Sequence, residues 1–219
     1  MNSISDIKNV FYINLDYRED RKIHVEKQLK SIGIENPTRF KAVELQNPAI
    51  GCSVSHLKIL EEAKKDNLEH VLIVEDDITF LDTELFVNQF NKFLSTHKDF
   101  DVVLIAGNNM PPYQPIDDCC VQVTKCQTTT GYLVQNHYFD TLINNYKMGI
   151  CLLMNSPEKH TLYAIDKHWF YLQAIHKWYL IIPLTVTQRA DYSDIEKRST
   201  NYSKVMLSLD KDFLFAPKI

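Results

Sequence analysis

The stretch VLIVEDD, from Val71 to Asp77, decides the fold, because four aliphatic residues run directly into three acids. An apolar run of this length, without polar alternation, is too short for a buried helix and is typical of a parallel strand covered on both faces. The acids then lie at the carboxyl end of that strand, which is where ligands bind in open α/β sheets. The stretch therefore predicts an α/β fold with a site at residues 75–77.

The three adjacent acids suggest what this site binds. Neighbouring carboxylates repel one another, and a hard divalent cation with oxygen ligands is the simplest group that stabilises them together. The alternative is that the acids cap the following helix or face water. The stretch alone leaves both interpretations open.

The composition limits the class of protein. A length of 219 residues suits one α/β domain, 1–219, with a C-terminal embellishment. Only five glycines are present, and neither GxGxxG nor GxxxxGK[ST] occurs, which disfavours Rossmann oxidoreductases and P-loop NTPases. The formal net charge of -4 argues against a nucleic-acid partner bound through overall positive charge.

The cysteines and the N-terminal residues indicate a compartment. The five cysteines include the adjacent pair Cys119 and Cys120, but neither a CxxC motif nor a zinc-like Cys/His spacing occurs, so reduced thiols are expected. Residues 1–9 lack the pattern of a signal peptide, and no apolar run approaches the roughly 18 residues of a membrane span. The sequence predicts a soluble, cytoplasmic protein without an integral membrane segment.

Two arginines follow the first predicted strand, Val10–Ile13. A helical pattern begins at about Arg18 and stops at Gly33, so Arg18 and Arg21 share one face of its first turn. Cations oppose the helix dipole there unless an anion docks beside them. Binding of an anionic ligand is the functional interpretation, and solvated arginines are the alternative.

A second helix opens within Gly51–Leu57, with Ser53 or Ser55 as its expected N-cap. His56 then falls in the first turn, where an imidazole can donate to a phosphate or a ribose. A structural hydrogen bond is the alternative role for this histidine.

The chain after the acids continues the α/β pattern. A helix with a phenylalanine core stripe begins at Asp82 or Thr83, and another buried strand follows at Asp101–Ala106. The proline-rich segment Asn108–Asp118 is a candidate lid or acceptor-facing loop. Asp166 stands where an N-cap is expected. Further strands are expected at 40–43, 121–124, 130–134, 178–182 and 184–186, a helix from residue 136, and a polar tail at 188–201.

Six elements carry a family resemblance when they are taken together. They are Phe11–Leu15 with Arg18 and Arg21, Gly51–His56, Glu75–Asp77, Gly131-Tyr132, Asp166, and Ser193–Ile195. In this order and approximate spacing they resemble glycosyltransferase family 25, which includes bacterial lipooligosaccharide β-galactosyltransferases and animal and viral collagen galactosyltransferases. The resemblance extends from Val10 to Ser199.

This resemblance implies a GT-A-like fold, with a mostly parallel central sheet flanked by helices and a C-terminal β/α embellishment. It also implies inverting transfer of a hexose from a nucleotide sugar, UDP-linked, to a hydroxyl of a glycan, lipooligosaccharide or protein. Glu75–Asp77 matches the family's DxD-type motif, so that Asp77 ligates Mn2+ or Mg2+ and Glu75 lies near the ribose or the metal's water shell. The donor-binding residues implied are Asn14, Arg18, Arg21, Ser55, His56, Glu75, Asp76, Gly131 and Tyr132.

An inverting transfer also needs a general base on the face opposite the leaving diphosphate. Asp166 matches the acid that the family shows before its last core helix, and Asp191 and Asp194 are the alternatives. Two other functions remain open at this level. One is a metal-dependent phosphohydrolase that uses the same acids, although no second metal-binding set is evident, and the other is a non-catalytic domain that binds a nucleotide sugar or a glycan.

Overall fold

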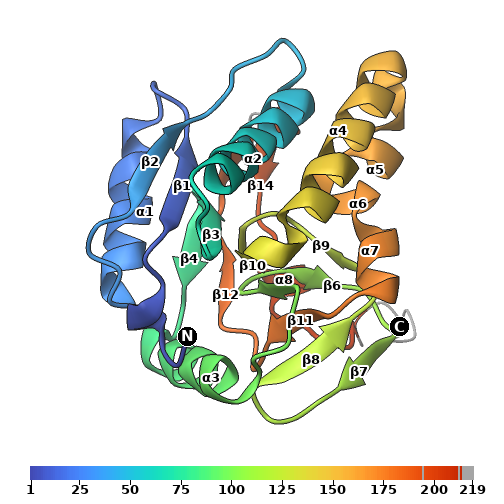
Figure 1. Cartoon of the computed structure of the whole chain (residues 1–219). Helices are drawn as coiled ribbons and strands as arrows, with labels where there is room; N and C mark the ends of the chain where they lie inside the picture. Colours follow the sequence, from blue (N-terminus) through green and yellow to red (C-terminus); the bar gives the residue numbers. More distant parts are fainter. Residues whose placement is uncertain (194, 212, 214–219) are drawn as a thin grey trace.

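A central eight-stranded sheet with helices on both faces forms the body of the protein (Figure 1). The computed structural model describes residues 1–193, 195–211 and 213. In spatial order the strands are β2 (Thr38–Lys41), β1 (Val10–Asn14), β3 (His70–Glu75), β10 (Gly131–Gln135), β5 (Val102–Leu104), β11 (Trp178–Ile181), β8 (Cys120–Val123) and β7 (Tyr113–Pro115).

The α/β class is confirmed, but the sheet is mixed and not mostly parallel. The pairs β2–β1, β1–β3 and β5–β11 are parallel, whereas β3–β10, β10–β5, β11–β8 and β8–β7 are antiparallel. The difference arises because β10 enters between β3 and β5 in the opposite direction. The β7–β8 hairpin then extends the far edge. A local apolar pattern carries no information on strand direction, so the sequence could not show this.

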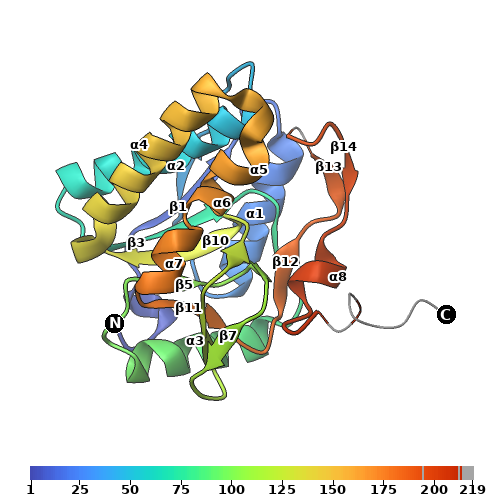
Figure 2. The same ribbon diagram turned by 90° about the vertical axis from the view of Figure 1, so that its right-hand side faces the viewer.

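Strand β3 is central and buried, as predicted. Val71, Leu72, Ile73 and Val74 are fully buried. Helices α1 (Glu19–Ser31) and α3 (Thr83–Thr96) pack on the face of Leu72 and Val74, while α2 (Pro48–Lys65) and α4 (Phe139–Asn155) pack on the face of Val71 and Ile73 (Figures 1 and 2). Burying each such side chain stabilises the fold by about 1.5 to 3 kcal/mol, and the two helical layers fix β3 from both sides.

Helix α2 begins earlier than predicted. The side chain of Asn47 is its N-cap and accepts from the Ala49 N–H at 3.1 Å, and Pro48 takes the first helical position. The expectation of a cap at Ser53 or Ser55 was therefore wrong, because Asn-Pro is the stronger start signal. His56 consequently lies well inside the helix and not in its first turn.

The cap expected at Asp166 was also wrong. Ala164 is in the N-cap position of the short helix α6 (Ile165–His168), and Asp166 is its second residue. The Asp166 carboxylate therefore does not cap α6 and contacts other groups.

The chain after β11 returns to the segment that directly follows the three acids. β12 (Val186–Gln188) pairs antiparallel with β4 (Ile78–Phe80), and the tail predicted to be polar forms a hairpin of β13 (Asp191–Ser193) and β14 (Arg198–Thr200), visible beside α8 in Figure 2. The remaining elements are η1 (Ile4–Asp6), β6 (Asn108–Asn109), β9 (Cys126–Gln127), η2 (Asn136–Tyr138), η3 (Pro157–Lys159), α5 (His160–Tyr163), α7 (Phe170–Ile175) and α8 (Ser203–Met206). Within the described residues, no helix combines the length and apolar character that crossing a bilayer requires.

Candidate active site

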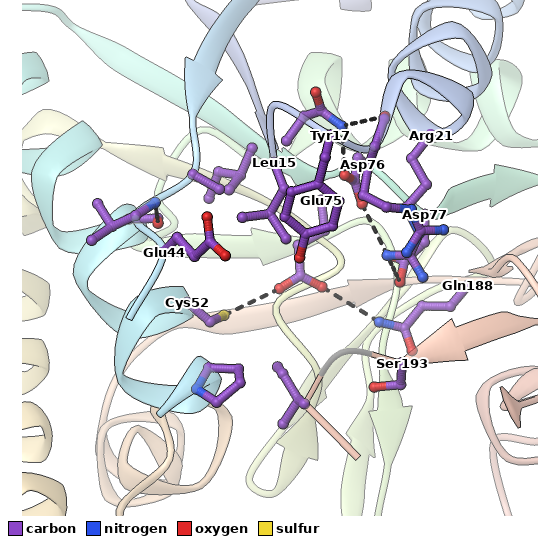
Figure 3. A pocket seen from close by; sticks show the side chains of 18 of the residues that line it. Leu15, Tyr17, Arg21, Glu44, Cys52, Glu75, Asp76, Asp77, Gln188 and Ser193 are labelled. Carbon is purple, nitrogen blue, oxygen red and sulfur yellow. Dashed lines mark hydrogen bonds and ion pairs between the residues drawn. The ribbon is translucent and has the colours of Figure 1, made fainter. Parts of the chain in front are cut away.

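The carboxyl ends of β1 and β3 meet at one edge of the sheet, because the two strands are parallel neighbours with Ile13 opposite Glu75. A cavity of about 320 Å³ opens there (Figure 3). A second cavity of about 890 Å³ adjoins it, since Cys52, Glu75 and Gln188 line both. Asp77 lines the smaller cavity and Asp166 the larger one.

Glu75 stands between the two cavities with both carboxylate oxygens engaged. Its Oε1 accepts from Thr129 Oγ1 at 2.7 Å, His56 Nε2 at 3.4 Å and Cys52 Sγ at 3.6 Å, and its Oε2 accepts from Gln188 Nε2 at 3.4 Å (Figure 3). Burial raises the pKa of Glu75, but the hydrogen bonds from His56, Thr129 and Cys52 outweigh it and lower the pKa below its usual value. Glu75 is therefore a fixed, ionised carboxylate.

Asp76 ties the acidic strand to α1. Its Oδ2 accepts from Asn14 Nδ2 at 2.8 Å and its Oδ1 from Arg21 Nη1 at 3.1 Å. Asn14 is buried, and it also donates to the Arg18 carbonyl and accepts from Arg39 Nε at 3.0 Å. Burial raises the pKa of Asp76, and Arg21 and Asn14 oppose that shift.

Asp77 differs from its two neighbours because one of its oxygens is unused. Its Oδ2 lies 3.5 Å from Arg21 Nη1, whereas its buried Oδ1 has no hydrogen-bond partner among the described residues. Burial, and then the negative charge of Glu75, raise the pKa of Asp77 well above its usual value. An orphaned carboxylate oxygen of this kind calls for an explanation, and hard divalent cations take oxygen ligands.

A second set of candidate ligands adjoins Asp77. The ligand atoms of Cys52, His56 and Glu75 lie within 4.8 Å of one another. The oxygen ligand of this set is Glu75, which already has four hydrogen-bond donors. Asp77, whose Oδ1 has no partner among the described residues, is thus the stronger candidate for direct ligation of a hard cation.

Arg18 and Arg21 are held by the C-terminal hairpin. Arg18 Nη2 lies 2.7 Å and Arg21 Nε 3.3 Å from Asp191 Oδ2, and Arg21 Nη2 donates to the Tyr192 carbonyl at 2.9 Å. Their side chains are only 14% and 12% exposed, so the alternative of solvated arginines was wrong. Burial raises the pKa of Asp191, but its hydrogen bond from Tyr192 N–H and the charges of Arg21 and Arg18 lower it overall.

Asp166 projects into the larger cavity. Its Oδ2 accepts from the Thr128 N–H at 3.2 Å and lies 3.6 Å from Lys167 Nζ. Burial raises the pKa of Asp166, and Lys167 and the Thr128 hydrogen bond oppose the shift only in part. Of the alternatives, Asp191 lines neither of these two cavities of the described chain, and Asp194 lies outside the described residues.

The GCSVSH segment of α2 builds one wall of the smaller cavity. A Cβ added at Gly51 would meet the Val43 carbonyl oxygen at 2.4 Å, so only glycine lets α2 approach that segment so closely. Ser55 lines the cavity, and its Oγ accepts from the Val43 N–H and donates to the Gly51 carbonyl, both at 2.8 Å. The serine therefore fixes the backbone of the opposite wall.

His56, Tyr132 and Gly131 lie behind the cavity wall. His56 and Tyr132 are fully buried, and His56 Nδ1 lies 2.9 Å from the Tyr132 hydroxyl, which accepts from the Tyr146 hydroxyl at 3.1 Å. A Cβ at Gly131 would come within 2.7 Å of Ile105. These residues thus pack and orient the acidic strand, with His56 as the link to Glu75.

Several lining residues were missed from the sequence. Tyr17, which is 58% exposed, and Glu44 line the smaller cavity, and Cys52 and Gln188 contact Glu75 (Figure 3). Tyr17 lies in the loop directly after β1, and this position at the carboxyl end of a strand could have identified it as a lining residue from the sequence. In the proline-rich segment 108–118, the only described residue that lines either cavity is Asn108, and β7 is an edge strand of the sheet.

A comparison with known protein families identifies the class of this α/β protein. The model of glycosyltransferase family 25 (LPS biosynthesis protein) matches residues 36–157, and the chain belongs to this family. The predicted resemblance and enzyme class are thereby confirmed, and the phosphohydrolase alternative is disfavoured. No curated protein gives a significant match.

Solved structures with a related fold share little sequence with this chain. Mannose-1-phosphate geranyltransferase from Thermus thermophilus has 10% identity and a TM-score of 0.42, with 78% of this chain and 58% of that one covered. A glycosyltransferase involved in glycosylation of the major capsid of PBCV-1 has 12% identity and a TM-score of 0.44, with 78% and 80% covered. A Drosophila beta-1,4-galactosyltransferase 7 mutant in complex with manganese, UDP-Gal and xylobiose has 16% identity and a TM-score of 0.34, with 62% and 52% covered.

Proposed function

We propose that this family 25 glycosyltransferase is an inverting, metal-dependent hexosyltransferase that uses a UDP-sugar and a hydroxyl of a glycan, lipooligosaccharide or protein acceptor. The observation that carries the proposal is the buried Oδ1 of Asp77, which has no hydrogen-bond partner among the described residues and lies beside Arg21 in the smaller cavity. A carboxylate oxygen and a guanidinium in one pocket are complementary to a diphosphate with its counter-cation.

The smaller cavity suits the donor. Arg18 and Arg21 bind the diphosphate by charge-assisted hydrogen bonds that replace those to Asp191. The exposed ring of Tyr17, which lines this cavity, would provide a flat surface for the uracil base. Asp76 and Asn14 hold the arginine-bearing helix in position.

Asp77 would hold Mn2+ or Mg2+, with Glu75 near the cation's water shell. When bound, the cation supplies electrostatic stabilisation of the charge that develops on the leaving diphosphate. Ser55, His56, Gly131 and Tyr132 act indirectly. They fix the cavity wall and the orientation of Glu75.

The larger cavity suits the acceptor, and Asp166 is its general base. Burial raises the pKa of Asp166 toward the range in which a carboxylate removes a proton efficiently from a hydroxyl. The competing acid Asp191 has a lowered pKa and is ion-paired with two arginines, which makes it a poorer base. Glu75 borders both cavities, so the donor and the acceptor would meet next to it.

Donor turnover tests the proposal. The protein is incubated with MnCl2 and, separately, UDP-glucose, UDP-galactose and UDP-N-acetylglucosamine, and released UDP is measured. One donor should be hydrolysed slowly, and EDTA or Asp77→Asn should abolish the release, while the exposed-site control Asp140→Asn should not. Once an acceptor is found, NMR of the product should show the anomeric configuration opposite to that of the donor. A folded protein that neither binds nor hydrolyses any of the donors would refute the proposal.

A further inference from the structure

A second group of metal-ligating side chains lies outside the acidic cleft. His97 directly follows α3, Asp117 is in the turn between β7 and β8, Cys119 precedes β8 and Cys120 begins it. One ligand atom from each of the four lies within 4.8 Å of the others. Among the described lining residues of the two cavities, none belongs to this group.

The cluster is held together by rigid contacts. The Asp117 Oδ1 accepts from the backbone N–H groups of Cys119 at 2.8 Å and Cys120 at 3.0 Å, and its Oδ2 lies 2.7 Å from His97 Nε2. Cys120 Sγ lies 3.8 Å from the same imidazole nitrogen. Both cysteines are fully buried, and the His97 ring stacks on Phe93 at a centroid distance of 5.1 Å.

We propose that His97, Asp117, Cys119 and Cys120 bind one Zn2+ ion in a tetrahedral, structural site. Two thiolates, an imidazole and a carboxylate are the ligand types that zinc prefers, and four protein ligands leave no open position for substrate. This donor set differs from the oxygen-rich acidic cleft, so the two sites select different metals.

Two distances in the cluster are close to those that zinc requires, and all ligand atoms lie within 4.8 Å of one another. Zinc–ligand bonds of about 2.0 to 2.3 Å set the ligand atoms of a tetrahedron roughly 3.3 to 3.8 Å apart. The separation of 3.8 Å between Cys120 Sγ and His97 Nε2 already meets this requirement. The His97–Asp117 contact of 2.7 Å must open by roughly half an ångström, so the ion replaces one hydrogen bond and leaves the backbone in place.

The site would cross-link parts of the chain that are distant in sequence. It joins the end of α3 to the start of β8, at the bottom of Figure 1. Cys120 is paired with Ile181 on β11, so the ion also braces the antiparallel half of the sheet. Binding to the folded state alone raises stability by mass action, and thermal unfolding therefore reports on the site without any assay of activity.

Metal uptake tests the proposal. The full chain is reduced, stripped with EDTA, desalted and dialysed against Zn2+ alone, and bound metal is counted by mass spectrometry. One equivalent should bind and raise the melting temperature, and Co2+ should give the visible bands of a tetrahedral thiolate complex. Cys120→Ser and His97→Asn, the latter at a partly exposed position, should each weaken binding more than about 100-fold, because outer-shell partners alone contribute 10- to 100-fold.

Three controls separate this site from other cysteines and from the acidic cleft. Cys151→Ser removes an exposed thiol, Cys52→Ser removes the thiol beside Glu75, and Asp77→Asn removes the proposed active-site ligand. All three should keep the zinc equivalent. Absence of stoichiometric uptake by the reduced wild type, or loss of uptake in Cys52→Ser with retention in folded His97→Asn, would overturn the assignment. Release of UDP from the donor does not depend on zinc uptake at this site, so the two proposals can fail separately.

Discussion

Replacing Asp77 by Asn tests the metal assignment most directly. The substitution keeps the shape of the side chain but replaces its carboxylate by a neutral amide. In that carboxylate, Oδ1 has no partner among the described residues and Oδ2 lies 3.5 Å from Arg21 Nη1. An interaction with a charged group is worth about 1.5 to 3 kcal/mol, which corresponds to roughly one to two decades in affinity. Asp77→Asn should therefore weaken Mn2+-dependent UDP binding by that factor or more.

The same variant should not destabilise the metal-free protein. Burial and the charge of Glu75 raise the pKa of Asp77 well above its value in the unfolded chain. A raised pKa means that the folded state binds the proton more tightly, so this contribution to stability is present below the unfolded pKa and is lost as the pH rises through the folded pKa. Near pH 7, which lies above the unfolded pKa, the wild-type protein has lost part or all of this contribution to its free energy of unfolding. The neutral amide of Asp77→Asn carries no such loss.

Two measurements decide the matter. Calorimetric titration of UDP with and without MnCl2 gives the metal dependence, and thermal unfolding of the metal-free protein gives the stability. Asp140→Asn is the matched control, because Asp140 is exposed and paired only with Lys64 in the described contacts. Retention of the full manganese dependence by folded Asp77→Asn would refute the reasoning from the orphaned oxygen.

Three further outcomes are expected. Arg18→Ala and Arg21→Ala should raise the donor KM by roughly one to two decades and change kcat less, since the proposed contacts to the diphosphate would be made in both the ground state and the transition state. Unchanged donor affinity in steady-state assays would contradict this. Asp166→Asn should lower kcat by about two to four decades with little change in donor affinity, and near-normal turnover would move the base to another acid. Burial lowers the pKa of His168 below its ordinary value of 6.5, so its contribution to stability is present above the unfolded pKa and is lost as the pH falls through the lower, folded pKa. Urea titrations over this range should show a flatter stability profile for His168→Gln, and an identical profile would contradict this.

The local patterns of the sequence predicted the parts of the fold that depend on local physics. The aliphatic run before Glu75 is buried on both faces, and the phenylalanine stripe of α3 packs in the core. Arg21 and the acids come together because β1 and β3 are parallel neighbours. These outcomes follow from periodicity and from the common edge of parallel strands, both of which can be read from one chain.

The contacts that could not be predicted are those between distant segments. Gln188 reaches Glu75, 113 residues earlier, only because β12 pairs with β4. Asp191 reaches Arg18 only because the polar tail folds into a hairpin. The direction of β10 has the same origin, since strand polarity is set by the whole topology and not by the strand's own residues.

The three acids differ in their contacts because the first two continue the alternation of side-chain direction in β3, whereas the third does not. Successive side chains of a strand point to opposite faces, so Glu75 follows Val71 and Ile73 toward α2 and its His56, whereas Asp76 follows Leu72 and Val74 toward α1 and Arg21. β3 ends at Glu75, and Asp77 lies in the turn beyond it, where neither helix supplies a donor for Oδ1. An abrupt end of the strand after its first acid therefore leaves the third carboxylate with one free oxygen at the cavity. A strand two residues longer would include Asp77 and direct it toward the α2 face, where Glu75 already takes the available donors, and the site for a cation would be lost.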